Sequence, residues 1–162
     1  MGFLVKCHDL NPSINAHFAP IRMATDVMQA FCTDRAMVCY ALEVWSKYLP
    51  AFMRAHPLAP SSFQIIVQLS VRNMKKFEES YEIQIYACRV LSCAANSPGA
   101  RRYVLEVSGA AELLGRNLHR YSSSTNGGGA ALYRQSNLAL TSISALLPSD
   151  KERRIASTVV VL

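Results

Sequence analysis

The sequence predicts an all-α protein built from stacked helices, and three observations support this prediction. Apolar residues recur at three- and four-residue steps, the spacing that places side chains on one face of a helix. Alternating strand patterns are scarce, and the β-prone residues 159–162 are too few to found a sheet. Prolines and glycines divide the chain into helical pieces, with breaks expected at Pro12, Pro20, Pro50–Pro60, Pro98, Gly127–Gly129 and Pro148.

Residues 83–95 carry the clearest helical pattern. Their apolar positions form a stripe wide enough to touch neighbouring helices on two sides, and its members are Ile83, Tyr86, Ala87, Val90, Leu91, Ala94 and Ala95. Helix starts are expected at Ser61-Ser62 and Ser80, since a serine hydroxyl can accept a backbone N–H of the first turn. Asn96-Ser97-Pro98 is expected to end one helix and open the next. Residues 122–129 are expected to form a polar, glycine-rich loop.

The composition is that of one globular domain. The 162 residues are 51% hydrophobic, which is enough for a packed core, and only 17% are charged, which suggests that a partner covers part of the apolar surface. The net charge of +6 is unevenly placed: residues 1–60 carry five Lys/Arg against four Asp/Glu, and residues 61–162 carry twelve against seven. Such a basic region can attract nucleic acid or an acidic protein, although a solvated basic face is the simpler interpretation.

Cysteine usage indicates a protein of a reducing compartment. The five cysteines are odd in number and include no CxxC pair, so we expect free thiols and a cytoplasmic location, with the nucleus as the alternative. No signal peptide is evident at the N-terminus. No segment approaches the ~20 apolar residues that a membrane-spanning helix needs, so no membrane partner is expected.

The chain aligns with itself at two offsets. Residues 86–91 match residues 40–45 at an offset of 46, and residues 138–143 at an offset of 52. The second offset recurs between the arginine pairs at 101–102 and 153–154. Such self-similarity is typical of helical repeat proteins, in which each unit buries its apolar faces against the next unit.

The unit Gln84–Leu118 resembles the armadillo-repeat family, with HEAT repeats as a near relative. It combines a long helical pattern, a short helix that begins near Arg101-Arg102, a glycine turn at Gly109 and a second long helix. The resemblance implies a right-handed α-solenoid of armadillo-like repeats in a single domain of residues 1–162, or in a segment of a longer solenoid. The implied repeat-like units lie at about residues 20–60, 61–109 and 110–162.

The flanking units match the family pattern less well. In the first unit, residues 21–31 and 34–49 are expected to form a helix pair, and the proline-rich residues 50–60 replace the short helix. In the last unit, residues 150–162 are expected to begin a short helix. The chain ends in Val-Val-Val-Leu without the polar cap that usually closes a solenoid, so we expect this end to contact another protein or a second copy of the chain.

No arrangement of residues for catalysis emerges, so we expect a non-enzymatic protein without cofactor or metal. The four histidines are scattered, and Cys7-His8-Asp9 lacks a second pair of metal ligands. Gly127–Gly129 lacks the Gly-Lys-Ser/Thr ending of a phosphate-binding loop, and no Gly-x-Ser-x-Gly elbow occurs. A helical enzyme with an unrecognised site is the weaker alternative.

The resemblance also implies where a partner would bind. In armadillo proteins the helix that bears the Ala-Leu-x-x-Leu pattern lines a concave groove, and the positions one before, two after and six after the buried alanine of that helix share a face. In the three aligned segments these positions include Leu138 and Ala145 and the candidate groove residues, which are Tyr40, Glu43, Lys47, Tyr86, Arg89, Cys93 and Thr141. Tyrosine and arginine are frequent anchors of interfaces, but Tyr40 and Tyr86 could equally be core residues and Arg89 a solvated one.

We therefore expect a scaffold or adaptor that binds another protein or peptide through this groove or through the apolar ends of the solenoid. Arg89 would favour an acidic or phosphorylated partner. The alternative is a helical repeat protein that binds nucleic acid through its basic C-terminal two-thirds, along an edge formed by Arg101, Arg102, Arg153 and Arg154. Those arginines could instead cap carbonyls of the preceding helix or pair with a neighbouring repeat.

Overall fold

A computed structural model describes residues 12–55, 62–97, 100–107, 109–124 and 127–145 of the chain. Within these residues every regular element is an α-helix and none is a strand, so the expected all-α class is confirmed. The helices in chain order are α1 (Pro12–Ala30), α2 (Arg35–Ala55), α3 (Ser62–Lys76), α4 (Tyr81–Asn96), α5 (Arg101–Glu106), α6 (Ala110–Tyr121) and α7 (Gly127–Ser144).

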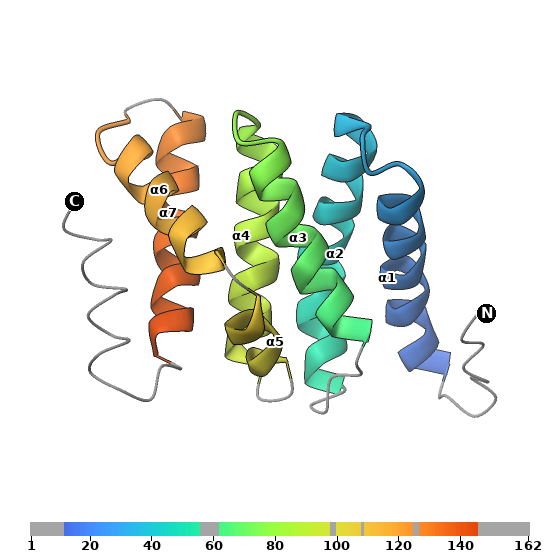
Figure 1. Ribbon diagram of the computed structural model, residues 1–162. Coiled ribbons are helices and arrows are strands. Elements are labelled where there is room, and N and C mark those ends of the chain that lie inside the picture. Colours follow the sequence, from blue (N-terminus) through green and yellow to red (C-terminus); the bar gives the residue numbers. More distant parts are fainter. Residues whose placement is uncertain (1–11, 56–61, 98–99, 108, 125–126, 146–162) are drawn as a thin grey trace.

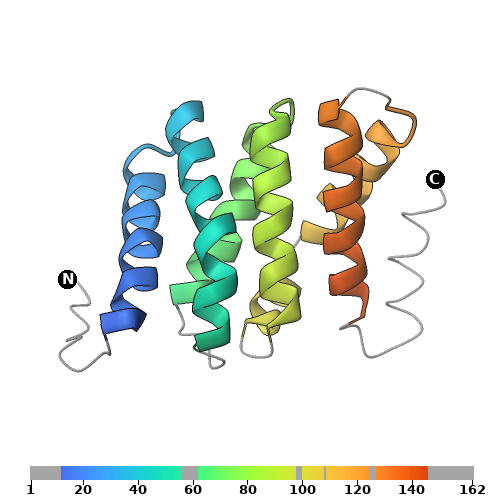
Figure 2. The same ribbon diagram turned by 180° about the vertical axis from the view of Figure 1, so that it is seen from behind.

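The helices form two layers. Figure 2 shows α1, α2, α4 and α7 side by side in this order, and contacts join α1 to α2, α2 to α4, and α4 to α7. Helices α3, α5 and α6 form the second layer, which lies in front of α4 and α7 in Figure 1. Helices α2, α4 and α7 run in the same direction, and α1 runs opposite to them. The second layer therefore covers one side of the α2–α4–α7 row and leaves the other side uncovered by described helices.

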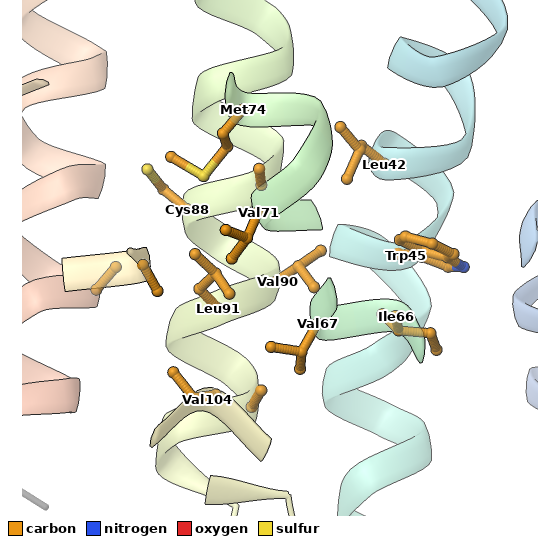
Figure 3. Close-up of a cluster of buried hydrophobic side chains, with 14 of the residues drawn as sticks. Leu42, Trp45, Ile66, Val67, Val71, Met74, Cys88, Val90, Leu91 and Val104 are labelled. Carbon is orange, nitrogen blue, oxygen red and sulfur yellow. The ribbon is translucent and has the colours of Figure 1, made fainter. Parts of the chain in front are cut away.

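The hydrophobic core lies between the two layers. Figure 3 shows a central part of it, to which four helices contribute Leu42 and Trp45 of α2, Val67 and Val71 of α3, Val90 and Leu91 of α4, and Val104 of α5. Each of these side chains is at most 3% exposed. Apolar residues at helical spacing on α2, α3 and α4 thus meet in one contiguous cluster, as the sequence pattern predicts.

Polar side chains in the core bond to neighbouring helices. The indole Nε1 of Trp45 donates a hydrogen bond of 3.2 Å to the carbonyl oxygen of Ile21 and so links α2 to α1. The amide Nδ2 of Asn73 donates to the carbonyl oxygen of Leu69 at 2.8 Å and to the sulfur of Met28 at 3.1 Å, which joins α3 to α1. Because buried polar groups without partners are costly, these bonds make the buried indole and amide compatible with the core.

The apolar stripe predicted for residues 83–95 is buried in α4. Six of its seven members are at most 1% exposed, and the seventh, Tyr86, is half-buried at the edge of the stripe. The predicted helix starts are also found, because α3 begins at Ser62 and Ser80 occupies the N-cap of α4. The Ser80 hydroxyl donates to the Glu82 carboxylate at 3.2 Å and makes no cap bond to the backbone.

The expected chain breaks at Pro20 and Pro50 are wrong, because both prolines lie inside helices α1 and α2. Proline removes one helical hydrogen bond, so other interactions must hold the helix beyond it. In α2 those interactions are hydrophobic. Two side chains that follow Pro50 are buried: Phe52 is 5% exposed and Met53 is 6% exposed. Burial of this last stretch offsets the local cost, and α2 continues to Ala55.

The glycines differ from expectation in one place and agree in another. The loop expected over residues 122–129 is shorter, because α7 already begins at Gly127. A Cβ at Gly128 would meet the Tyr81 ring at 3.5 Å, so this first turn of α7 packs closely against α4. Gly109 has a φ of +88° at the N-cap of α6, which confirms the predicted glycine turn, since side chains disfavour this conformation.

The short helix expected from residue 150 and the apolar end at 159–162 lie outside the described residues.

Candidate partner-binding face

The seven candidate groove residues lie at exposed or half-buried positions of α2, α4 and α7, on the side of the row that the second layer does not cover. We call this side the outer face. Tyr40 is 47% exposed, and Glu43, Lys47, Arg89 and Thr141 are also exposed. Tyr86 and Cys93 of α4 are half-buried. The three helices that carry the candidate residues run side by side in the same direction (Figure 2).

The three segments that align in sequence also match in burial. Their central alanines are each 0% exposed: Ala41, Ala87 and Ala139. The residues four positions later are at most 4% exposed: Trp45, Leu91 and Ile143. The residues just before the alanines are half-buried or exposed: Tyr40, Tyr86 and Leu138. Equivalent sequence positions therefore have equivalent environments in α2, α4 and α7.

An open hollow of about 600 Å³ lies on the outer face between these helices. Its lining includes Ser46, Pro50 and Arg54 of α2, Arg89 and Cys93 of α4, and Gln135 of α7. We call it the Arg54–Arg89 hollow. It brings together two of the seven candidate residues, Arg89 and Cys93, and the other five do not line it.

Arg54 was missed by the sequence analysis because α2 was expected to end before Pro50. A usable signal existed, since Arg54 follows the candidate residue Lys47 by seven positions, or about two helical turns, and therefore shares its face. Gln135 lies four positions before the buried Ala139. It was missed because the earliest candidate position in each helix was the one just before the alanine. Both residues become visible as parts of one site only when the three helices are placed side by side.

Arg54 and Arg89 have no carboxylate within 4.0 Å among the described residues. Other arginines of the chain do: Arg35, Arg116 and Arg120 bind glutamates at 3.5, 3.3 and 2.7 Å. The guanidinium of Arg89 lies 5.7 Å from the centre of the Tyr86 ring, within the range of a cation–π contact. The hollow therefore carries two positive charges that no described acidic side chain neutralises.

The groups beside the hollow are held in their neutral forms. Burial raises the pKa of the Cys93 thiol to about 11, although the Arg54 guanidinium acts in the opposite direction. Burial also raises the pKa of the Tyr86 hydroxyl; the negative charge of Glu43 adds to this effect, and Arg89 opposes it. A thiol must ionise to act as a nucleophile, so Cys93 at neutral pH is a packing residue and not a reactive one.

We expect slow alkylation of Cys93 in the folded protein. Raising the thiol pKa from 9.0 to about 11 lowers the thiolate fraction at pH 8 about 100-fold. The higher pKa also makes the remaining thiolate more nucleophilic, so the rate of iodoacetamide labelling at Cys93, measured by mass spectrometry of its peptide, should be at least about tenfold lower in the folded protein than in urea. Equal rates would contradict the assigned burial.

The raised pKa of the Cys93 thiol also affects stability. Because the thiol of the unfolded chain ionises at a lower pH than the thiol of the folded chain, the free energy of unfolding should fall as the pH rises above 9.

A second hollow, of about 450 Å³, lies beside α6 and includes Glu78, Arg116 and His119 in its lining. Its charged groups are already bound to one another, because Arg116 contacts Glu78 at 3.3 Å and Glu112 at 4.0 Å. Among the described residues, no hydrogen bond joins the His119 ring to a carboxylate. A buried amide network supports this region: Asn117 donates to Gln84 Oε1 at 3.0 Å. These bonds indicate a contact that holds α6 against the rest of the fold.

Only part of the predicted basic edge lies among the described residues. Arg101 is exposed at the first position of α5, Arg102 follows it in the same helix, and Arg153 and Arg154 lie outside the described residues. The sequence analysis missed another basic cluster: Arg72, Lys75 and Lys76 of α3 line a hollow of about 560 Å³. Within that cluster, Lys76 Nζ donates a hydrogen bond of 3.0 Å to the carbonyl oxygen of Cys32.

Within the described part of the chain, no group of three or more His, Cys, Asp or Glu side chains could hold a metal ion. None of the described helices combines the length and apolar character needed to cross a membrane. Comparison with known proteins finds no matching family model, no matching curated protein and no matching solved structure.

Proposed function

We propose that the protein is a non-enzymatic scaffold that binds a protein partner on the outer face of α2, α4 and α7. One observation carries this proposal: an open hollow between three parallel helices contains two arginines, Arg54 and Arg89, without acidic partners among the described residues. Arginine beside exposed tyrosine and leucine is a frequent composition of protein interfaces, and here Arg89, Tyr40 and Leu138 share the outer face. An acidic or phosphorylated segment would supply the missing negative charge.

We further propose that the chain is a right-handed solenoid of about three armadillo-like repeats, with α2, α4 and α7 as the groove-lining helices of successive units. The matched burial of the three aligned segments and the parallel order of these helices support this arrangement. In such a solenoid each unit covers its neighbour's apolar flank, and the groove-lining helices together offer one continuous binding surface.

The test is a comparison of partners captured by wild-type protein and by Arg89→Glu. Charge reversal places a carboxylate where the partner's negative charge would lie, so we expect the specific partner to be lost. Capture from the native source followed by quantitative mass spectrometry measures this loss. Circular dichroism should be unchanged, because Arg89 is exposed and forms no ion pair with any residue that the structure describes.

Arg72→Glu is the matched control. Arg72 is an exposed arginine on α3, in the second layer, so its reversal makes the same change of charge away from the outer face. Partners retained by Arg72→Glu and lost by Arg89→Glu would support the proposal. If every captured protein binds Arg89→Glu as well as wild type, the outer face is not the binding surface.

Nucleic-acid binding is the second candidate, and the cluster of Arg72, Lys75 and Lys76 favours it. A nucleic acid would bind by releasing counterions from its phosphates, so its affinity would fall steeply with salt concentration. A titration of the protein with a labelled oligonucleotide at two salt concentrations distinguishes nucleic-acid binding from binding of a protein partner. Arg72→Glu should then weaken binding more than Arg89→Glu does.

A further inference from the structure

The Arg54–Arg89 hollow has a recognisable chemistry of its own. Its two guanidinium groups come from different helices, α2 and α4, and both are exposed. Gln135 of α7 also lines the hollow and adds a neutral amide that can donate hydrogen bonds. Two positive charges and an amide around one open space match a small anion that carries more than one charge and several acceptor oxygens.

The wall of the hollow on the side of α7 is fixed by hydrogen bonds. Asn96 Nδ2 donates to the Ser92 carbonyl oxygen at 2.9 Å and to Ser142 Oγ at 3.0 Å, and the hydroxyls of Ser92 and Ser142 lie 3.3 Å apart. These bonds join α4 to α7 beside Arg89. A ligand between the helices would therefore meet a wall that is already organised, which lowers the entropic cost of binding.

Two further groups at the hollow lack a usual hydrogen-bond partner within the described residues. Ser97, at the C-cap of α4, is 7% exposed, and its hydroxyl has no hydrogen-bond partner among the described residues. Pro50 has no N–H, so the carbonyl oxygen of Ser46 receives no hydrogen bond from the residue four positions later in α2. A backbone acceptor of this kind suits the N–H of a bound peptide and not an isolated anion.

A phosphate-bearing ligand on the outer face would meet the acidic Glu43 as well as the basic Lys47. Glu43 lies exposed on the same face, and its charge acts on Tyr86, the residue that stacks with Arg89. A nucleic acid carries a phosphate at every nucleotide and would place further negative charges near Glu43. A peptide with a single phosphate avoids this repulsion and can place a basic residue against Glu43.

From these observations we propose that the Arg54–Arg89 hollow binds a phosphorylated serine or threonine side chain of a peptide that lies across α2, α4 and α7. This inference rests on the proposed scaffold function and names the partner class of the same face. A phosphate group carries a charge of nearly −2 and three acceptor oxygens, so it can engage both arginines at once, which a carboxylate with one charge does less well.

The test uses degenerate peptide pools that differ at one fixed central residue: phosphoserine, phosphothreonine, serine or glutamate. Fluorescence polarisation measures the binding of each pool to the full chain and to Arg54→Gln, Arg89→Gln and Arg72→Gln. We expect the phosphorylated pools to bind at least about tenfold tighter than the serine pool, as expected for charge-assisted hydrogen bonds. This preference should be lost in Arg54→Gln and in Arg89→Gln and kept in the control Arg72→Gln.

Several results would overturn the inference. They are equal binding of the serine and phosphorylated pools, equal binding of the glutamate pool, absence of binding by every pool, and a preference that survives both Arg54→Gln and Arg89→Gln. Displacement of the phosphorylated peptides by a single-stranded oligonucleotide at an equal concentration of phosphate groups would assign the hollow to nucleic acid instead. A captured partner that is lost with Arg89→Glu but unaffected by phosphatase would overturn the phosphate inference and leave the scaffold function standing.

Discussion

Trp45→Ala should lower the free energy of unfolding by about 3–5 kcal/mol. Among the described residues Trp45 is the largest fully buried side chain, and it lies in α2 with its indole directed towards α1 (Figure 3). Its removal leaves a cavity that rigid neighbouring helices cannot close, and it also deletes the 3.2 Å hydrogen bond from Nε1 to the Ile21 carbonyl oxygen. Urea denaturation followed by circular dichroism measures the change.

Trp45→Phe separates packing from hydrogen bonding in this prediction. Phenylalanine keeps much of the buried aromatic volume but cannot donate to Ile21, so we expect a smaller loss of about 1–2 kcal/mol. If Trp45→Ala cost no more than Trp45→Phe, the indole would not be packed in the core as the structure places it.

Leu91→Ala should cost about 2–5 kcal/mol, as truncation of a buried leucine does. Leu91 is 0% exposed in α4 and lies in the cluster with Val71 of α3 and Val104 of α5 (Figure 3). It therefore contacts the second layer, and its loss weakens the attachment of that layer to α4. The same denaturation experiment measures this effect.

Leu138→Ala is the matched control for Leu91→Ala. Leu138 of α7 is 57% exposed, so the same chemical change should alter stability by no more than about 0.5 kcal/mol. A cost below ~1 kcal/mol for Leu91→Ala, or equal costs for the two variants, would mean that the buried and exposed faces of α4 and α7 are wrongly assigned.

Much of the local structure could be predicted because it depends on local chemistry. The spacing of Ile83, Ala87 and Leu91 predicts one buried face of α4, and all three are 0% exposed. Gly109 predicts a turn, since it is the residue type that tolerates a φ of +88°. The self-alignment predicts equal environments for Ala41, Ala87 and Ala139, and the structure agrees at each position.

The errors came from places where long-range packing outweighs local preference. Pro50 usually ends a helix, yet the burial of Phe52 and Met53 carries α2 past it. Gly128 usually belongs to a loop, yet close packing against Tyr81 places it in the first turn of α7. Glycine destabilises the interior of a helix by about 1 kcal/mol relative to alanine. The burial of neighbouring apolar side chains can offset this cost.

The sequence by itself determined which residues of each helix are apolar and which face solvent, because that information is contained in a spacing of three and four residues. Only the tertiary structure decided that Arg54, Arg89 and Gln135 share one hollow, since they come from three helices and are separated by 35 and 46 positions in the chain. Packing distances between helices depend on the sum of many small contacts across the core. For that reason the buried face of α4 could be predicted from the sequence, whereas the hollow between the helices could not.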